Sequence, residues 1–516
     1  MRVMIIGIDG GTWDILGPAC DKGLMPNLNR FRNEGVYGTL KSTHPPITPP
    51  AWTTLMTGMN PGHHGIGGFF EYDPDKKVTK NINSTNIRNE TLWHKLARHG
   101  KKVVVVGVPM TYPPFEVDGI LVSGFETPST ACQFTYPPSF RDEILKEIPQ
   151  LEFMPPFTRK EKRDVKNFPR YLDWLRDNAE HMLKIFKMGL QKTPWTVSMI
   201  VLKSFDELVH HFCRLLDFAS DTSNDSRDKQ IERYFKELDE AIGELLKLAE
   251  QNKAAALIVS DHGGETKTAT IYINNILKKL GFLKAIPKWK ALFESFKTSE
   301  GLNSNPDDRL KIIDYDSTKA FVAGVGIYAN LYINKSCKHF DKNYAKEKED
   351  LITELRQNLM KINAADGEKL FTSVIKPTEV YGRDINEEGL PDIMIVPRKG
   401  YSINARLDKN KVIEFTGKKS LSGDHSINGM IAMMGSGIAT RKKIEADIAD
   451  ITPTILAMLN LPVTNDIDGK IIEVAFTIPL NVKFESPART TMMGSYSYSK
   501  EEQEKINSRL ADLGYI

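Results

Sequence analysis

The sequence predicts an α/β fold with a mostly parallel central sheet. Short, largely apolar runs occur at Val3 to Ile8, Thr196 to Leu202 and Ala255 to Val259. Strands buried on both faces of a parallel sheet have this near-continuous apolar character. Amphipathic helical patterns run from Tyr171 to Phe186 and from Ile231 to Ala249, between these strands. Alternation of buried strands with amphipathic helices is typical of a sheet covered by helices.

Four further strands are predicted by the same apolar pattern. They lie at Val103 to Val106, Phe321 to Ile333, Ile393 to Val396 and Met430 to Met434. A chain of 516 residues is long enough for one large α/β domain with insertions, or for two or three smaller domains. We expect one large domain interrupted by inserted segments.

The predicted domain covers residues 1–485 and holds two inserted cap segments. The first, at about 127–194, is rich in prolines and charges around its one amphipathic helix, and the second, at about 266–320, is rich in lysines. A polar tail over 486–516 follows, with a short charged helix at Lys500 to Leu510.

The composition is that of an ordinary soluble globular protein. Apolar residues make up 41% of the chain and charged residues 26%, and the net charge of +3 gives no reason to expect a nucleic-acid partner. The four cysteines have no CxxC spacing, so neither a disulfide framework nor a cysteine zinc site is indicated. The apolar start of the chain is too short for a signal peptide, and no run of about 18 apolar residues predicts a membrane span. These features predict a cytoplasmic protein.

A proline-rich stretch around Thr48 has the most distinctive chemistry. Pro49 and Pro50 fix the backbone after Thr48, and a helix is predicted to begin near Pro50. The Thr48 hydroxyl then lies beside a helix N-terminus, where orphan N–H groups and the helix dipole favour an anion such as phosphate. The alternative interpretation is a proline-rich turn that is capped by a threonine.

Carboxylates and imidazoles follow several of the predicted strands. Asp9 comes directly after the first strand, Asp261 and His262 follow the strand that ends at Val259, and His425 precedes the strand at Met430. Ligands of open α/β sheets gather beyond the carboxyl ends of the strands, which makes these residues candidates for a site. Each of them, taken alone, is equally well explained as part of a polar turn.

A helical turn after the strand that ends at Leu202 offers a further ligand pair. Asp206 and His210 are four residues apart, so a helix places both on one face within reach of a single cation. Glu207 and His211 have the same spacing on the adjacent face. The spacing alone leaves both faces open as the ligand face.

Taken together, these residues fit two divalent cations. Zinc accepts nitrogen and oxygen ligands, and two cations about 4 Å apart can clamp both oxygens of an in-line displacement at phosphorus. A threonine hydroxyl coordinated to one of them would lose its proton at neutral pH and become a nucleophile. The three carboxylates and three imidazoles are Asp9, Asp206, His210, Asp261, His262 and His425.

The order of these residues resembles that of the alkaline phosphatase superfamily. The chain looks most like its type I phosphodiesterase and nucleotide pyrophosphatase branch and the allied group of phosphohydrolases and phosphomutases. The resemblance covers most of the chain and rests on these segments: Gly7-Ile8-Asp9-Gly10, Pro46 to Gly58, His64-Gly65-Ile66, Ser260-Asp261-His262-Gly263, Pro391-Asp392-Ile393, Gly423-Asp424-His425, Asp450 to Leu456 and Asp468-Gly469. It implies an alkaline-phosphatase-like three-layer sandwich.

The resemblance also implies a role for each candidate residue. Thr48 is the expected nucleophile, which is phosphorylated transiently, and it is also an expected metal ligand. Two divalent metal ions are implied, with zinc the first choice and manganese an alternative. One ion is expected on Asp9, Thr48, Asp261 and His262, and the other on Asp206, His210 and His425.

Two departures from the family pattern narrow the expected substrates. The nucleotide pyrophosphatases have an asparagine after the His-Gly segment that binds a phosphoryl oxygen, whereas Gly67-Gly68-Phe69-Phe70 stands in that region here. This departure weakens the expectation of diester specificity. The sulfatase branch needs a cysteine with a nearby arginine, and Thr48 to Trp52 offers neither. Sulfate esters are therefore not the expected substrates.

Three functions fit the sequence. The first is a metal-dependent phosphohydrolase that cleaves phosphate ester, phosphodiester or pyrophosphate bonds of a small, nucleotide-like molecule through a phosphothreonine. The second is a phosphomutase, which needs caps that exclude water. The third is a non-catalytic scaffold that binds metal and acts through the C-terminal helix. Because the ligand set and the nucleophile are both complete, the sequence favours the hydrolase.

Overall fold

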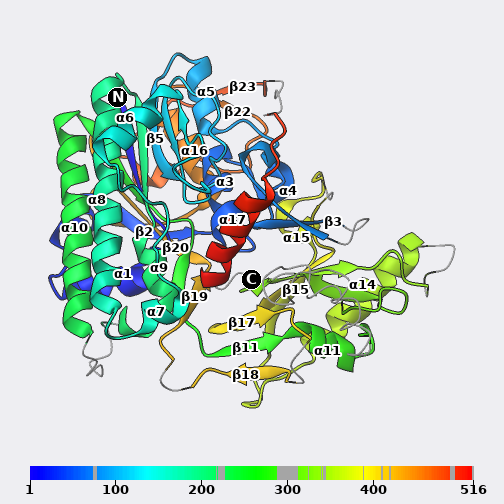
Figure 1. Ribbon diagram of the computed structural model, residues 1–516. Helices are drawn as coiled ribbons and strands as arrows, with labels where there is room; N and C mark the ends of the chain where they lie inside the picture. The colour runs from blue at the N-terminus through cyan, green and yellow to red at the C-terminus, as the bar shows by residue number, and fades with distance from the viewer. Residues whose placement is uncertain are drawn as a thin grey trace. The chain divides into compact units, whose positions relative to one another are not determined.

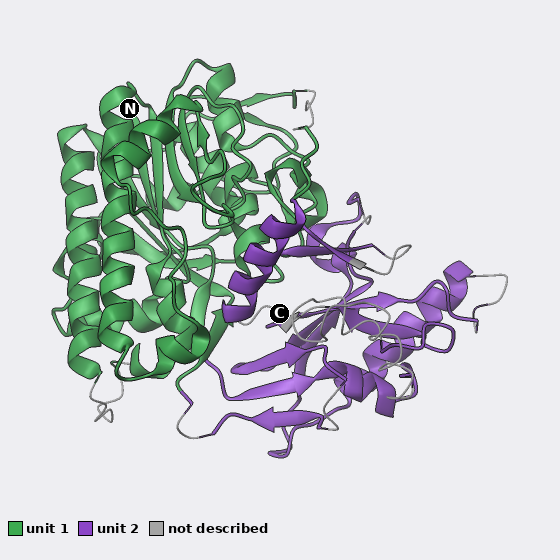
Figure 2. Cartoon of the chain, in the orientation of Figure 1, with its two compact units in different colours: residues 1–68, 82–265, 421–498 green, residues 69–81, 266–420, 499–516 purple. Residues whose placement is uncertain are grey.

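The computed structural model shows an α/β protein (Figure 1). It describes residues 1–73, 78–216, 218, 227–286, 312–323, 325–338, 340, 344–386, 389–407, 411–417, 420–488 and 494–513. The chain forms two compact units, each made of separate stretches of sequence (Figure 2). Unit 1 comprises residues 1–68, 82–265 and 421–498, and unit 2 comprises residues 69–81, 266–420 and 499–516.

Unit 1 is built on a nine-stranded sheet. The five strands β9, β1, β8, β5 and β6 are parallel neighbours, and β20 runs antiparallel between β9 and β2. In spatial order the strands are β21 (Lys442–Asp447), β2 (Val36–Lys41), β20 (Asn428–Met434), β9 (Ala254–Val259), β1 (Arg2–Ile8), β8 (Val197–Leu202), β5 (Val103–Val108), β6 (Gly119–Ser123) and β7 (Thr135–Tyr136).

Helices cover both faces of this sheet. Along β1 the side chains alternate, with Val3 and Ile5 in one apolar core and Met4, Ile6 and Ile8 in the other. The core on the Met4 side includes α1 (Trp13–Asp21), α2 (Pro26–Glu34), α8 (Phe168–Lys192), α9 (Ser204–Phe212) and α10 (Asp228–Gln251). The core on the Val3 side includes α3 (Thr48–Thr57), α5 (Leu92–Arg98) and α16 (Ile451–Met458). The three-layer sandwich is therefore confirmed.

Short elements complete unit 1. A small two-stranded sheet joins β10 to β19, and another joins β22 to β23. The bounds of these elements are α4 (Pro61–His64), α6 (Ser139–Glu147), α7 (Arg159–Arg163), β10 (Gly263–Thr266), β19 (Gly423–Ser426), β22 (Pro462–Thr464) and β23 (Lys483–Glu485).

Unit 2 has a separate apolar core and its own sheets. One sheet has the order β12-β14-β16-β15, another the order β13-β17-β11-β18, and β3 pairs with β4. The elements are β3 (Phe70–Asp73), β4 (Val78–Asn81), β11 (Ala269–Tyr272), α11 (Ile273–Lys279), β12 (Ala320–Ala323), β13 (Val325–Gly326), β14 (Ala329–Ile333), α14 (Tyr344–Met360), β15 (Phe371–Ile375), α15 (Pro377–Tyr381), β16 (Ile393–Pro397), β17 (Tyr401–Asn404), β18 (Ile413–Phe415) and α17 (Lys500–Leu513).

The predicted strands are confirmed, but not all of them join the central sheet. The run from Phe321 to Ile333 contains β12, β13 and β14, and β12 pairs antiparallel with β14 in unit 2. The strand predicted at Ile393 is β16 of the same sheet. Strands that are apolar along their length are buried in either setting, so the apolar pattern could not separate the two sheets.

The predicted cap segments fall in different units. The segment at about 127–194 lies in unit 1, where its long helix α8 packs on β5 and β8 beside α10 (Figure 1). The segment at about 266–320 lies in unit 2, and its residues 287–311 are outside the described part of the chain. Whether either segment acts as a cap, and whether 486–516 acts as a separate tail, stay predictions. No helix in the described ranges is long and apolar enough to cross a membrane.

Candidate metal centre

The candidate residues come together at the carboxyl edge of the central sheet of unit 1. Asp9 directly follows β1, the pair Asp261-His262 follows β9, and Asp206 lies in the first turn of α9, after β8. Because β9, β1 and β8 are adjacent parallel strands, their carboxyl ends meet at one edge. β19, which carries His425, pairs with β10 just after His262. The topology therefore brings distant stretches of sequence into one site.

The first ligand cluster contains Asp9, Asp261 and His262. One ligand atom from each of the three lies within 4.8 Å of the other two, and all three side chains are fully buried. The Nε2 atom of His262 is 3.2 Å from Oδ2 of Asp261 and 3.7 Å from Oδ1 of Asp9. Two carboxylates and an imidazole around one point form a donor set that suits zinc or a similar cation.

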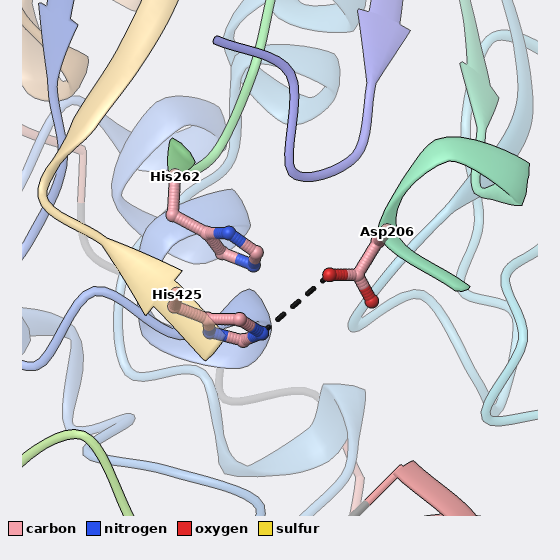
Figure 3. Close-up of side chains that lie close together, drawn as sticks. All are labelled: Asp206, His262 and His425. Carbon is pink, nitrogen blue, oxygen red and sulfur yellow. Dashed lines mark ion pairs between the residues drawn. The ribbon is translucent and has the colours of Figure 1, made fainter. Parts of the chain in front are cut away.

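The second cluster contains Asp206, His210 and His425. Oδ1 of Asp206 is 3.4 Å from Nε2 of His210 and 3.5 Å from Nε2 of His425, and the two imidazole nitrogens are 3.0 Å apart. Figure 3 shows Asp206 facing His425 from the opposite side of the site. Converging atoms of this kind offer a second cation one oxygen and two nitrogen ligands.

His262 lies between the two clusters. Its ligand atom is also within 4.8 Å of those of Asp206 and His425, and its ring stacks on that of His425 with centroids 3.6 Å apart (Figure 3). Sequence reasoning assigned His262 to the first ion alone. Only the folded arrangement shows that it reaches both clusters, because nothing in the spacing of the two histidines predicts a stack.

Several carboxylate oxygens in the centre are buried without a hydrogen-bond partner. Both oxygens of Asp9 are in this state, together with Oδ1 of Asp206 and Oδ2 of Asp261. A buried polar atom without a partner costs free energy, and a buried carboxylate costs more unless a cation compensates it. The orphaned oxygens therefore fit two divalent cations as their missing partners.

The histidine rings are oriented with Nε2 toward the centre. Nδ1 of His262 lies 3.0 Å from the carbonyl oxygen of Gly263, and Nδ1 of His425 lies 3.0 Å from that of Pro46. A carbonyl oxygen only accepts, so each Nδ1 carries the hydrogen and donates it, and Nε2 keeps its lone pair for a metal. The Pro46 carbonyl also links the loop before Thr48 to a ligand of the second cluster.

The three carboxylates perturb one another. Burial raises the pKa of Asp9 well above its usual value, and the nearby Asp261 and Asp206 raise it further. Burial and the charge of Asp206 raise the pKa of Asp261 to about 7. Burial acts on the pKa of Asp206 in the same direction, but His210 and His425 bring it below its usual value. Without cations, therefore, the centre resists ionisation of Asp9 and Asp261.

In the metal-free protein, the contribution of Asp261 to stability is expected to fall as pH rises from about 4 to about 7, because the folded protein keeps a proton on Asp261 that the unfolded chain has already released. Buried histidines such as His210, whose pKa burial lowers to about 4, contribute in the opposite direction. Thermal unfolding after chelation, at several pH values, measures the effect. The stability of the wild type relative to the Asp261→Asn variant should fall over this window, and a difference that does not change with pH would contradict this assignment.

Thr48 is buried beside the two clusters. It is the first residue of α3, and its Oγ1 lies 3.4 Å from Nε2 of His262. The helix therefore begins slightly before the predicted start near Pro50. Pro49 and Pro50 have no amide hydrogen, and the amide of Ala51 donates to the Ile47 carbonyl oxygen. The N-terminus of α3 thus offers a bound phosphate fewer N–H groups than the sequence predicted. More of the negative charge of that phosphate is then left for metal cations to compensate.

Two residues outside the predicted set influence Asp9. The ammonium group of Lys203 and the indole N–H of Trp52 both lower its pKa, against the larger effect of burial. Trp52 lies one helical turn after Thr48 and is fully buried. The four-residue spacing from Thr48 is the one sequence signal that pointed to it.

The helix α9 presents Asp206 and His210 to the centre and turns Glu207 and His211 away. Glu207 accepts hydrogen bonds from Lys162 and Tyr171. Among the described residues, neither nitrogen of His211 has a hydrogen-bond partner, and burial lowers the pKa of His211 well below its usual value. The arrangement favours the Asp206 and His210 face, which the sequence left open.

Substitution of His210 by alanine is therefore expected to abolish turnover, whereas His211→Ala should keep most of it. The two histidines are neighbours in α9 and both are buried, so the second variant is a matched control for loss of packing. Steady-state kinetics with a common phosphate ester substrate measures both variants. The reverse pattern would assign the ligand role to the Glu207 and His211 face.

Comparison with known proteins agrees with this fold. A sequence profile of the type I phosphodiesterase / nucleotide pyrophosphatase family matches residues 3–428. No curated protein matches the chain in sequence. Phosphonoacetate hydrolase from Sinorhizobium meliloti 1021, in complex with phosphonoformate, is a structural neighbour with a TM-score of 0.54 and 15% identity, covering 88% of this chain and 94% of its own.

Two further solved structures are similar. The same hydrolase in complex with phosphonoacetate has a TM-score of 0.53 and 14% identity, with 88% of this chain and 94% of that chain covered. Human ectonucleotide pyrophosphatase / phosphodiesterase 5 has a TM-score of 0.49 and 14% identity, with 89% of this chain and 95% of that chain covered. At such identities the solved structures bear on the fold alone.

The family profile defines a hydrolase of the alkaline phosphatase superfamily that acts on phosphoric ester bonds. Within that superfamily, the chain belongs to the type I phosphodiesterase / nucleotide pyrophosphatase family, whose profile covers most of its length.

Proposed function

We propose that this chain hydrolyses phosphate ester, phosphodiester or pyrophosphate bonds of small molecules through a phosphothreonine at Thr48. The observation that carries the proposal is the position of the Thr48 hydroxyl. It is buried, 3.4 Å from Nε2 of His262, the residue that reaches both ligand clusters. A nucleophile between two cation sites is the arrangement that an in-line displacement at phosphorus requires.

Each residue of the centre has a proposed role. Asp9, Asp261 and His262 hold one divalent cation, to which Thr48 also binds, and Asp206, His210 and His425 hold the other. Zinc is the proposed metal, since imidazole and carboxylate ligands in small numbers suit it, and manganese is the alternative. When bound, these cations supply positive charge that lowers the pKa of the Thr48 hydroxyl and stabilises the transferring phosphoryl group.

The covalent step follows from the place of Thr48. Its Oγ atom gives its proton to water and attacks phosphorus, the bond from phosphorus to the leaving oxygen breaks, and the leaving group takes a proton back from water. Water then attacks the phosphothreonine, which releases the phosphoryl product and restores the hydroxyl. The Pro46 carbonyl orients His425 through Nδ1, and Pro49 and Pro50 restrict the backbone next to the nucleophile.

The substrate class comes from the family and its neighbours. The family takes its name from phosphodiesters and nucleotide pyrophosphates, and two similar structures are of a phosphonoacetate hydrolase. These compounds share a small, anionic phosphorus group with one bond to be cleaved. We therefore expect a small, nucleotide-like phosphate ester as substrate and include phosphonates in the test.

A substrate panel tests the proposal. Purified protein, with its metal content measured, is incubated with phosphomonoesters, phosphodiesters, nucleotide pyrophosphates, sugar phosphates and phosphonoacetate, and products are followed by phosphorus NMR. A hydrolase releases phosphate or a phosphomonoester, whereas a mutase yields an isomeric phosphate ester without net release. Absence of any conversion by metal-replete protein would contradict the proposal, and isomerisation alone would assign the mutase activity instead.

A further inference from the structure

Helix α9 contains two acid–histidine pairs that could bind a metal, and they are offset by one residue. Asp206 and His210 form the first pair, and Glu207 and His211 form the second. Neighbouring helical positions are separated by about 100° around the axis. Rotation of α9 by that amount would bring Glu207 and His211 toward the centre in place of the first pair. Some feature of the fold must select one rotation over the other.

The carboxylate of Glu207 is held by three donors in unit 1. The Nζ of Lys162 and the hydroxyl of Tyr171 each donate to Oε2 at 3.1 Å, and the Nζ of Lys203 donates to Oε1 at 3.4 Å. Glu207, Lys162 and Tyr171 are all buried. Lys162 lies in α7 and Tyr171 in α8, whereas Lys203 directly precedes α9, so two of the three donors come from helices earlier in the chain.

The stability of the fold does not explain why Lys162 and Glu207 are buried as an ion pair. A fully buried ion pair loses the hydration of both charges, and well-packed apolar residues at the same places are often as stabilising. What a buried ion pair provides in the best-attested cases is a unique register. The donors around Glu207 require a negatively charged acceptor. Because one rotation of α9 places the Glu207 carboxylate among these donors, that rotation is preferred.

A second contact links α7 to the segment that carries His425, another ligand of the second cluster. Arg163, next to Lys162 in α7, donates from Nη2 to Oγ of Ser422 at 2.6 Å. Ser422 lies three residues before His425, at the start of β19. The adjacent basic residues Lys162 and Arg163 of α7 therefore contact both segments that carry ligands of the second cluster.

We propose that Glu207, together with Lys162 and Tyr171, forms a positioning device that sets the rotation of α9 and so selects Asp206 and His210 as metal ligands. These three residues touch neither substrate nor metal. The proposal rests on the metal centre of the proposed function, and it adds a reason why only one of two equivalent ligand pairs is used.

The test compares metal binding with stability. In the double variant Lys162→Met/Glu207→Leu both charges are removed together, so the fold should hold while the rotation of α9 loses its constraint. We expect a thermal midpoint close to the wild type, unchanged binding of the first ion, and roughly 10- to 100-fold weaker binding of the second. Calorimetric titration of chelated protein with zinc, together with elemental analysis, measures each ion.

Two further variants keep the test decisive. Lys160→Met is the control, since Lys160 lies exposed in the same helix α7, and it should bind both ions as the wild type does. Tyr171→Phe removes a single hydroxyl donor to Glu207 and should weaken the second ion measurably even if the double variant fails to fold. Wild-type affinity for both ions in a folded double variant, or in Tyr171→Phe, would overturn the proposal. A wild type that binds no cation would overturn the proposed function as well.

Discussion

Substitution of His262 by alanine is expected to release one of the two bound cations and to abolish nearly all activity. The side chain is fully buried, and its Nε2 lies 3.2 Å from Asp261 and 3.7 Å from Asp9. Loss of the imidazole leaves two carboxylates of like charge in a buried pocket with one ligand fewer for the cation that compensates them. Elemental analysis after dialysis, with kcat/KM on the same sample, measures both effects.

A comparison of ligands sharpens this prediction. Asp261→Ala should also lose the first ion, but only His262 reaches both clusters, so His262→Ala should weaken the second ion as well. His64 provides a matched control outside the centre. It is equally buried and hydrogen-bonds to Thr54 through Nε2, so His64→Ala should affect stability and leave the metal content intact. A metal-free His262→Ala protein with full activity would refute the role of the centre in catalysis.

The sequence predicted the position of the site because chemistry and topology coincide there. Apolar runs that end in Asp9 and Asp261 identify strands of a parallel sheet by their burial, and parallel strands place their carboxyl ends at one edge. The structure has these strands as β1 and β9, adjacent in the sheet. Both facts follow from local sequence and one topological rule, so no knowledge of side-chain contacts was needed.

Relations that depend on side-chain direction were beyond the sequence. The choice between Asp206 and Glu207 rests on the donors Lys162 and Tyr171, which come from helices about 35 to 45 residues earlier in the chain. The stack of His262 on His425 joins a residue in the loop after β9 to one on β19. The discontinuous make-up of unit 2, which takes residues 69–81, 266–420 and 499–516, has no marker in the composition.

Burial of the centre explains why its carboxylates resist ionisation without cations and gain from binding them. Apolar strands and helices bring the site residues out of water, which makes unpaired charge costly and makes each electrostatic contact stronger. Asp9 and Asp261 then gain more from a divalent cation than exposed carboxylates would. The same burial limits the access of bulk water to Thr48, which favours first attack on the substrate by the threonine hydroxyl.

Thr48→Ala is expected to lower turnover by roughly three or more orders of magnitude while the protein keeps its bound cations. The substitution removes Oγ1, but the carboxylates and imidazoles of both clusters are untouched, so most of the ligand set remains. Thr48→Ser, which restores a hydroxyl at the same place, should recover appreciable activity. Steady-state kinetics and elemental analysis on the two variants and the wild type measure these outcomes side by side.

The same variants separate a covalent mechanism from direct attack by water. If water were the nucleophile, Thr48→Ala would lose little activity, because the cations and their ligands would still activate it. The covalent route also predicts a trapped intermediate: wild-type enzyme that is mixed with a phosphorus-labelled substrate and quenched rapidly in acid should carry label on the peptide that contains Thr48. Label on any other residue, or none during turnover of a substrate that the enzyme consumes, would rule out the phosphothreonine.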